Sequence, residues 1–158
     1  MRTQANPSRR TALGWALGAA LAAAAPVRAA GLPQATVHRD PSCGCCGAWV
    51  EHLRRAGFPV AVVETGDVDA VKRRLGVPAD LAACHTAEVG GYVIEGHVPA
   101  GAVRRLLAEK PVALGLAVPG MPVGSPGMEG SPPETYEVVL FGTGGRRTFA
   151  RYRGDREL

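Results

Sequence analysis

Residues 36–64, TVHRDPSCGCCGAWVEHLRRAGFPVAVVE, carry the pattern that decides the fold. The run at 36–40 predicts a short strand, and the next apolar residues recur at i, i+3, i+4 and i+7, the spacing of a helix with one buried face. Those residues are Cys46, Trp49, Val50 and Leu53. Gly57 ends this helix, and residues 59–64 predict a second, buried strand.

The following residues continue the alternation of strands and helices. Asp67 is a favourable N-cap for a second helix. Residues 86–89 and 92–95 flank Gly90-Gly91, which indicates a two-residue hairpin, and Pro99 begins a third helix. The apolar residues expected to face inward are Val68, Val71 and Leu75 of the second helix and Val103, Leu106 and Leu107 of the third. The order β-α-β-α-β-β-α predicts an α/β, thioredoxin-like fold with a mixed central sheet and covering helices.

The composition changes after the third helix. Residues 111–133 contain six Pro, five Gly, two Met and one charged residue, so we expect neither a helix nor a strand there. A segment of this length without secondary structure is uncommon in a compact domain unless it serves a site, which predicts a long ordered loop or lid. Residues 136–141 and 147–152, joined by residues 142–145, predict a C-terminal β-hairpin.

The first 29 residues predict a signal peptide. Residues 1–10 are polar, residues 12–25 are apolar and uncharged, and Val27-Arg28-Ala29 offers small residues for a signal peptidase. The alternative is an N-terminal membrane anchor, but the apolar run is shorter than the roughly 20 residues that cross a bilayer. We therefore expect cleavage near Ala29 and a soluble, exported domain of residues 30–158, with no membrane span after cleavage.

The export route stays open. The run from Ser8 to Leu13, which contains Arg9-Arg10, resembles a twin-arginine signal. Ala12 stands where that signal usually has Phe, so the general secretory route is the alternative.

The net positive charge of the chain comes from its first 29 residues. Lys and Arg number 18 against 14 Asp and Glu. Four arginines lie in residues 1–29, where there is no acid, so the remaining chain has 14 basic and 14 acidic residues. A domain without net charge lacks the excess of basic residues that binds nucleic acid, so we expect no nucleic-acid partner.

The main candidates for redox or metal-binding residues are four cysteines. Cys43 and Cys46 have the C-x-x-C spacing of a redox pair at the positive end of a helix, where thiol pKa values fall. Cys45 has no role in dithiol exchange, and three thiols on one turn can converge on soft metal ions. Cys84 precedes the strand at Thr86, which the predicted topology places across from that turn.

The cysteines have three interpretations. Exported proteins commonly form structural disulfides, and four cysteines allow three pairings. A second interpretation is a thiol–disulfide oxidoreductase in which Cys43 attacks and Cys46 resolves. We favour the third, metal–thiolate chemistry, because three cysteines crowded on one turn would crosslink little of the chain.

Histidines and methionines supply further candidate ligands. His85 adjoins Cys84 and is expected to face the site, and His97 lies at the entry to the third helix, which flanks the cysteine turn in this topology. Met121 and Met128 lie in the Pro/Gly loop, where there is little core to fill, and their thioethers would suit Cu(I). The remaining histidines, expected at the surface, are His38 and His52.

Long motifs in the chain resemble the CopG family of exported copper-resistance proteins. The motifs are PSCGCCGAWV at residues 41–50, Cys84-His85-Thr86, GYVIEGHVPA at residues 91–100 and GLAVPGMPVGSPGM at residues 115–128. The resemblance implies a periplasmic thioredoxin-like domain that binds copper, interconverts copper redox states and works beside copper efflux or chaperone proteins. Every candidate ligand position matches. The acidic, Met-rich segment that some relatives carry after the second Met is here only EGSPP, residues 129–133.

Together these observations predict a copper site. The expected ligands are Cys43, Cys45, Cys46, Cys84, His85, His97, Met121 and Met128. Four thiolates with neutral donors favour a multinuclear Cu(I) cluster, because each thiolate can bridge two ions. Zn(II) is the competitor, although Cys₄ zinc sites usually draw two ligands from each of two turns, and here three come from one. The thiol–disulfide oxidoreductase remains the alternative function.

Overall fold

The computed structural model describes residues 31–158, so the predicted signal peptide, residues 1–29, lies outside the described residues. The strands are β1 (Ala35–Arg39), β2 (Val60–Glu64), β3 (His85–Val89), β4 (Tyr92–Gly96), β5 (Gly115–Val118), β6 (Thr135–Gly142), β7 (Gly145–Arg153) and β8 (Arg156–Glu157). The helices are α1 (Gly44–Arg55), α2 (Val68–Arg74) and α3 (Ala100–Glu109), with a 3₁₀ turn, η1 (Ala79–Leu81). Within residues 31–158, no helix combines the length and the apolarity needed to span a bilayer.

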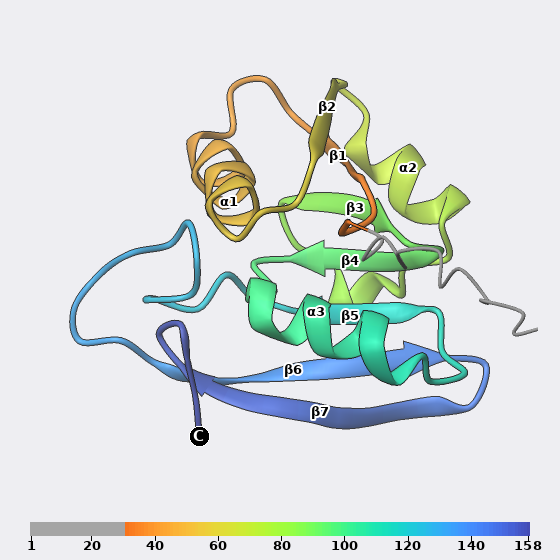
Figure 1. The fold of residues 1–158 in the computed structure, drawn as a ribbon. Coiled ribbons are helices and arrows are strands. Elements are labelled where there is room, and N and C mark those ends of the chain that lie inside the picture. The colour runs from red at the N-terminus through yellow and green to blue at the C-terminus, as the bar shows by residue number, and fades with distance from the viewer. Residues whose placement is uncertain (1–30) are drawn as a thin grey trace, which may run out of the picture. The chain divides into compact units, whose positions relative to one another are not determined.

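One mixed sheet organises these elements, in the strand order β2-β1-β3-β4-β5-β6-β7-β8 (Figure 1). β1 pairs in parallel with β2 and antiparallel with β3, and β3 and β4 form the hairpin predicted around Gly90-Gly91. The predicted β-α-β-α-β-β-α order and the mixed α/β class are confirmed. The thioredoxin-like assignment stays a prediction.

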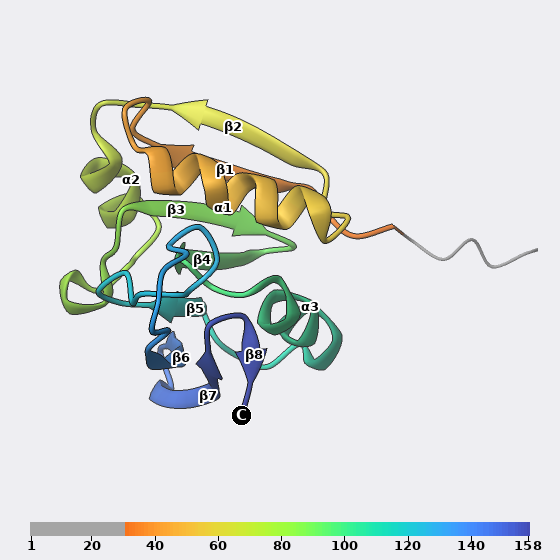
Figure 2. The same ribbon diagram turned by 90° about the vertical axis from the view of Figure 1, so that its left-hand side faces the viewer.

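Apolar side chains pack on both faces of the sheet. Neighbouring residues of β4 point to opposite faces, so Ile94 joins the core that α1 and α3 cover, whereas Val93 packs with Leu81 and Phe141. Figure 2 shows α2 and α3 on opposite sides of the sheet. The α1 residues predicted to be buried, Cys46, Trp49, Val50 and Leu53, are all buried.

The prediction that residues 111–133 hold no strand was wrong for β5. This strand lies inside the sheet, parallel to β4 and antiparallel to β6, and its four residues are buried. A strand buried on both faces has no polar alternation, so the periodicity that identifies other strands is missing. Gly115 also permits the pairing, because a Cβ there would lie 1.7 Å from Val93 O.

Two predicted burial patterns were also wrong. The strand expected to be buried, β2, lies at the sheet edge, and its Val63 side chain is exposed. The three apolar residues expected to face inward from the second helix are only partly buried, and Lys72 is the buried residue of α2. The N-cap prediction is confirmed, since Asp67 accepts a hydrogen bond from Ala70 N at 2.8 Å.

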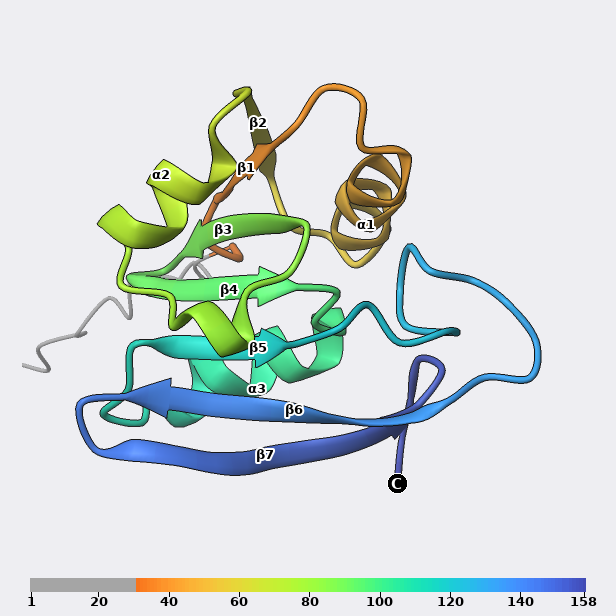
Figure 3. The same ribbon diagram turned by 180° about the vertical axis from the view of Figure 1, so that it is seen from behind.

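The C-terminal hairpin is confirmed and is longer than predicted, because β6 and β7 extend to Thr135 and Arg153. Between β5 and β6, residues 119–134 form the Pro/Gly loop, which Figure 3 shows extending from the end of β5 past α1. Backbone hydrogen bonds order this loop: Gly124 N donates to Met128 O at 2.6 Å, and Glu134 N donates to Val123 O at 2.9 Å.

Candidate metal site

The fold brings Cys84 to the cysteine turn, as predicted. Cys43 is the N-cap residue of α1, and Cys45 and Cys46 lie in the first turn of that helix. β1 runs into this turn, and its last residue, Arg39, pairs with His85 at the start of the antiparallel β3. The residue before β3 must therefore lie beside the turn that follows β1.

The sulfur atoms form one compact group. Cys43 and Cys46 are joined by a disulfide, with their Cα atoms 5.4 Å apart, and Cys45 and Cys84 are free thiols. Cys45 Sγ lies 3.5 Å from Cys43 Sγ and 3.8 Å from Cys84 Sγ. All four sulfurs lie within 4.8 Å of one another. The predicted cysteine ligands are thus brought together, in a form where two of them are oxidised.

Two imidazoles converge on the fourth sulfur. His85 Nδ1 lies 3.2 Å and His97 Nε2 3.1 Å from Cys84 Sγ. His97 Nδ1 lies 2.8 Å from the carbonyl oxygen of Pro126, which can only accept, so the neutral ring carries its proton on Nδ1. The Nε2 lone pair of His97 therefore faces Cys84. A histidine ligand in metal sites is oriented in the same way by a partner on its other nitrogen.

Burial sets the protonation of this group. Burial, reinforced by the nearby Cys45, raises the pKa of the Cys84 thiol to about 12. Burial likewise lowers the pKa of His97 and, together with the nearby His97 and Lys72, lowers the pKa of His85 well below its ordinary value. At neutral pH the metal-free site therefore holds neutral imidazoles, the form that binds metal, and a thiol that must lose its proton on binding.

A buried ion pair, which the sequence analysis missed, lies behind the site. Glu95 is fully buried and accepts hydrogen bonds from Lys72 Nζ at 2.7 Å, Ala83 N at 2.6 Å and Thr86 Oγ1 at 2.6 Å. Its contact with Ala83 holds the residue that precedes Cys84. The signal was present in the sequence: Glu95 is the one charged residue of β4, and Lys72 lies one helical turn after Val68, on the face expected to point inward.

The Pro/Gly loop packs directly on the site. Besides the Pro126 carbonyl, Gly127 approaches so closely that a Cβ there would lie 2.8 Å from Cys45 O and 3.2 Å from His97 Nδ1. Met128 is half-buried beside Gly127, whereas Met121 is exposed, with a positive φ of 48°. The loop therefore contacts the site through backbone atoms, and coordination by the two methionines stays a prediction.

The other two histidines differ from the expectation of surface residues. His38 is buried, and its Nε2 lies 3.1 Å from Glu88 Oε1. His52 is partly buried and accepts a hydrogen bond from Ala100 N, at the start of α3, at 3.0 Å. Burial, followed by the charge of Arg55, lowers the pKa of His52, and Asp155 and Glu129 oppose this effect. Both rings have structural partners, which sequence spacing does not reveal.

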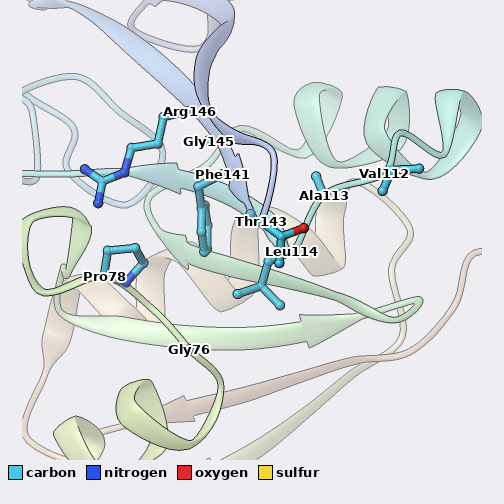
Figure 4. A pocket seen from close by; sticks show the side chains of 10 residues that line it. Gly76, Pro78, Val112, Ala113, Leu114, Phe141, Thr143, Gly145 and Arg146 are labelled. Atoms are coloured by element: carbon cyan, nitrogen blue, oxygen red, sulfur yellow. The ribbon is translucent and has the colours of Figure 1, made fainter.

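A separate pocket of about 490 Å³ lies near the ends of β5 and β6 that face away from the cysteines (Figure 4). Its lining residues are Gly76, Pro78, Val112, Ala113, Leu114, Phe141, Gly142, Thr143, Gly145 and Arg146. Arg146 is held by Asp80 at 2.9 Å, so its charge is already paired. The pocket contains none of the candidate ligands.

Known proteins resemble this chain in sequence and fold. Residues 81–128, which include Cys84, His85 and His97, match the family described as "Protein of unknown function, DUF411". The solved structure "Copper resistance protein copG- Form 1" is 45% identical, with a TM-score of 0.72 and a match covering 78% of this chain and 99% of that one. The chain belongs to the CopG family. The CopG structure "Form 2" agrees, with 44% identity, a TM-score of 0.72 and coverage of 77% and 98%.

Membership of the CopG family confirms the resemblance that the sequence motifs indicated. The mixed α/β fold is that of the CopG structures, and the match spans nearly their whole length. A comparison with curated protein sequences gave no match.

Proposed function

We propose that this chain handles copper in the periplasm and holds Cu(I) in a multinuclear thiolate site. The observation that carries the proposal is the convergence of four sulfurs within 4.8 Å, with two buried imidazoles on the fourth. Relatives that are 45% and 44% identical are copper resistance proteins by name, which supports copper as the cargo. Export would follow from the predicted signal peptide.

The sulfur spacing suits shared metal ions. Two sulfurs bound at ~2.3 Å to one ion, at an angle of about 100–110°, lie about 3.5–3.8 Å apart. The separations of Cys45 Sγ from Cys43 and Cys84 are 3.5 and 3.8 Å. Reduced, the site would offer four thiolates, a soft donor set that favours Cu(I), and each thiolate can bridge two ions.

The disulfide gives the site a redox capacity. Two electrons break the Cys43–Cys46 bond and form two thiolates, and two Cu(I) ions can supply one electron each as they become Cu(II). By this balance the site would interconvert copper redox states. In the alternative function, the reduced Cys43 attacks a substrate disulfide and Cys46 displaces the product. The oxidised pair at the N-terminus of α1 is the observation that favours this second candidate.

Met121 and Met128 are proposed as supporting ligands that control copper exchange, because their loop covers the site through Pro126 and Gly127. A thioether is soft and uncharged, so it would add less affinity than a thiolate but would slow release of Cu(I). Copper efflux or chaperone proteins are the proposed partners.

Cys45→Ser separates the two functions, because dithiol exchange does not need Cys45. We expect the anaerobically reduced variant to bind fewer Cu(I) ions per chain than wild type, measured by elemental analysis after desalting. Its Cys43–Cys46 pair should still oxidise and reduce normally. The control is Ser42→Ala, in the same turn, which should bind as much copper as wild type. Unchanged copper content in Cys45→Ser would remove the thiolate cluster and favour the oxidoreductase.

A further inference from the structure

The donors fall into two groups that share one sulfur. The thiolate group is Cys43, Cys45, Cys46 and Cys84, and the imidazole group is Cys84, His85 and His97. Within each group, all ligand atoms lie within 4.8 Å of one another. The disulfide removes two of the four thiolates from the first group and none of the donors from the second. Oxidation therefore has unequal effects on the two groups.

The imidazole group has the spacing of a one-ion site. An ion with metal–nitrogen and metal–sulfur bonds of about 2.05 and 2.3 Å places nitrogen and sulfur about 3.1–3.2 Å apart at an angle near 90–95°. The two nitrogen–sulfur distances on Cys84 are 3.2 and 3.1 Å. Opening both angles toward tetrahedral requires a separation of about 3.5 Å, a shift of a few tenths of an ångström.

The imidazole group is also held in place without the thiolates. Both rings are fully buried, and the ring of His85 packs at 4.4 Å, between centroids, against Trp49. The Pro126 carbonyl fixes His97 with its Nε2 lone pair toward Cys84. None of these contacts involves Cys43 or Cys46.

We propose that the Cys43–Cys46 disulfide converts the site from a multinuclear Cu(I) site into a one-ion site for a borderline divalent cation, Cu(II) or Zn(II), bound by Cys84, His85 and His97. One thiolate and two imidazoles form a harder donor set than four thiolates, and such sets bind copper and zinc ions. The pair is oxidised by exchange with a disulfide, which is reduced to two thiols as the Cys43–Cys46 bond forms. The inference rests on the proposed function for the cargo of the reduced state.

The test uses Co(II) as a spectroscopic probe of the oxidised protein and Cu(I) as a probe of the reduced protein. Oxidised wild type, with its disulfide verified by mass, should bind one Co(II) per chain with thiolate-to-cobalt absorption. Reduced wild type should bind several Cu(I) ions. Absence of Co(II) binding by the oxidised form, with Cu(I) binding intact, overturns this inference and spares the proposed function. Absence of Cu(I) binding by the reduced form overturns the proposed function.

Variants separate the two groups. Cys45→Ser lies in the thiolate group alone, so it should keep the Co(II) site and lose Cu(I) capacity. Cys84→Ser should lose the Co(II) absorption, and His97→Gln should weaken Co(II) binding at least tenfold, since even changes beyond the ligands commonly cost 10–100-fold. The Cys43→Ser, Cys46→Ser double variant, kept reduced so that Cys45 and Cys84 stay free thiols, has the donor set of the oxidised form and should bind one Co(II). Retention of the thiolate-to-cobalt band in Cys84→Ser, or its loss in the double variant, would refute the assignment.

Discussion

Replacing Glu95 with Gln tests whether the buried ion pair behind the candidate metal site determines the stability of the domain. The Glu95 side chain is 0% exposed and the Lys72 side chain 8% exposed, and their charged atoms lie 2.7 Å apart. Gln has nearly the same shape, so packing is preserved and only the negative charge is lost. The variant leaves the Lys72 ammonium buried without its counter-charge.

The expected loss in the free energy of unfolding is large. Removing one partner of a buried ion pair typically costs about 3–5 kcal/mol, out of a total of about 5–15 kcal/mol for a domain. A Gln side chain can still accept from Ala83 N through its one oxygen, but its amide group replaces the second acceptor used by Thr86. We therefore expect Glu95→Gln to be destabilised by about 3 kcal/mol or more, and the segment before Cys84 to be held less firmly.

Urea denaturation of the metal-free, disulfide-intact protein measures this loss. The matched control is Glu137→Gln, which breaks an exposed pair with Arg151 at 2.8 Å and should change the free energy of unfolding little, because solvent screens an exposed pair. The Lys72→Met, Glu95→Gln double variant removes the unpaired ammonium, so it should be more stable than Glu95→Gln alone. A Glu95→Gln protein as stable as Glu137→Gln would show that the buried pair contributes little.

Three other perturbations probe the contacts around the site. Burial lowers the pKa of His52, so the folded state binds fewer protons there than the unfolded state, and the contribution of His52 to stability is present above pH 6.5 and is lost as the pH falls below it. Between pH 7 and pH 5, urea denaturation should therefore show a smaller decrease in the free energy of unfolding for His52→Gln than for wild type. Gly127→Ala should cost about 1–3 kcal/mol in urea denaturation, because its Cβ would lie 2.8 Å from Cys45 O, whereas Gly144→Ala, with open space around it, should cost little. The Met121→Leu, Met128→Leu variant should keep its fold and its thiolate-bound copper but transfer Cu(I) to a chelator faster than wild type; equal transfer rates would show that the thioethers do not bind copper.

The cysteine site could be predicted from sequence because its geometry follows from strand order. Cys84 precedes β3, and a topology that pairs β3 antiparallel with β1 over their full length brings this residue to the turn after β1. β5 could not be predicted in this way. Its residues, Gly115 to Val118, become a strand only because β4 and β6 flank them, and tertiary pairing outweighs local propensity in such short segments.

The position of the Pro/Gly loop beside the site could be predicted from sequence, but its backbone contacts with the site could not. From sequence, the candidate metal ligands of the loop are its two methionine thioethers, because donor groups can be identified only from side-chain type. The structure shows that the loop also contacts the site through its backbone: the Pro126 carbonyl orients His97, and the missing side chain of Gly127 lets the loop lie against Cys45. A carbonyl oxygen is present in every residue, so its role cannot be found from residue type. Prolines and glycines suit this purpose, because they fix or permit the backbone path that places such an atom.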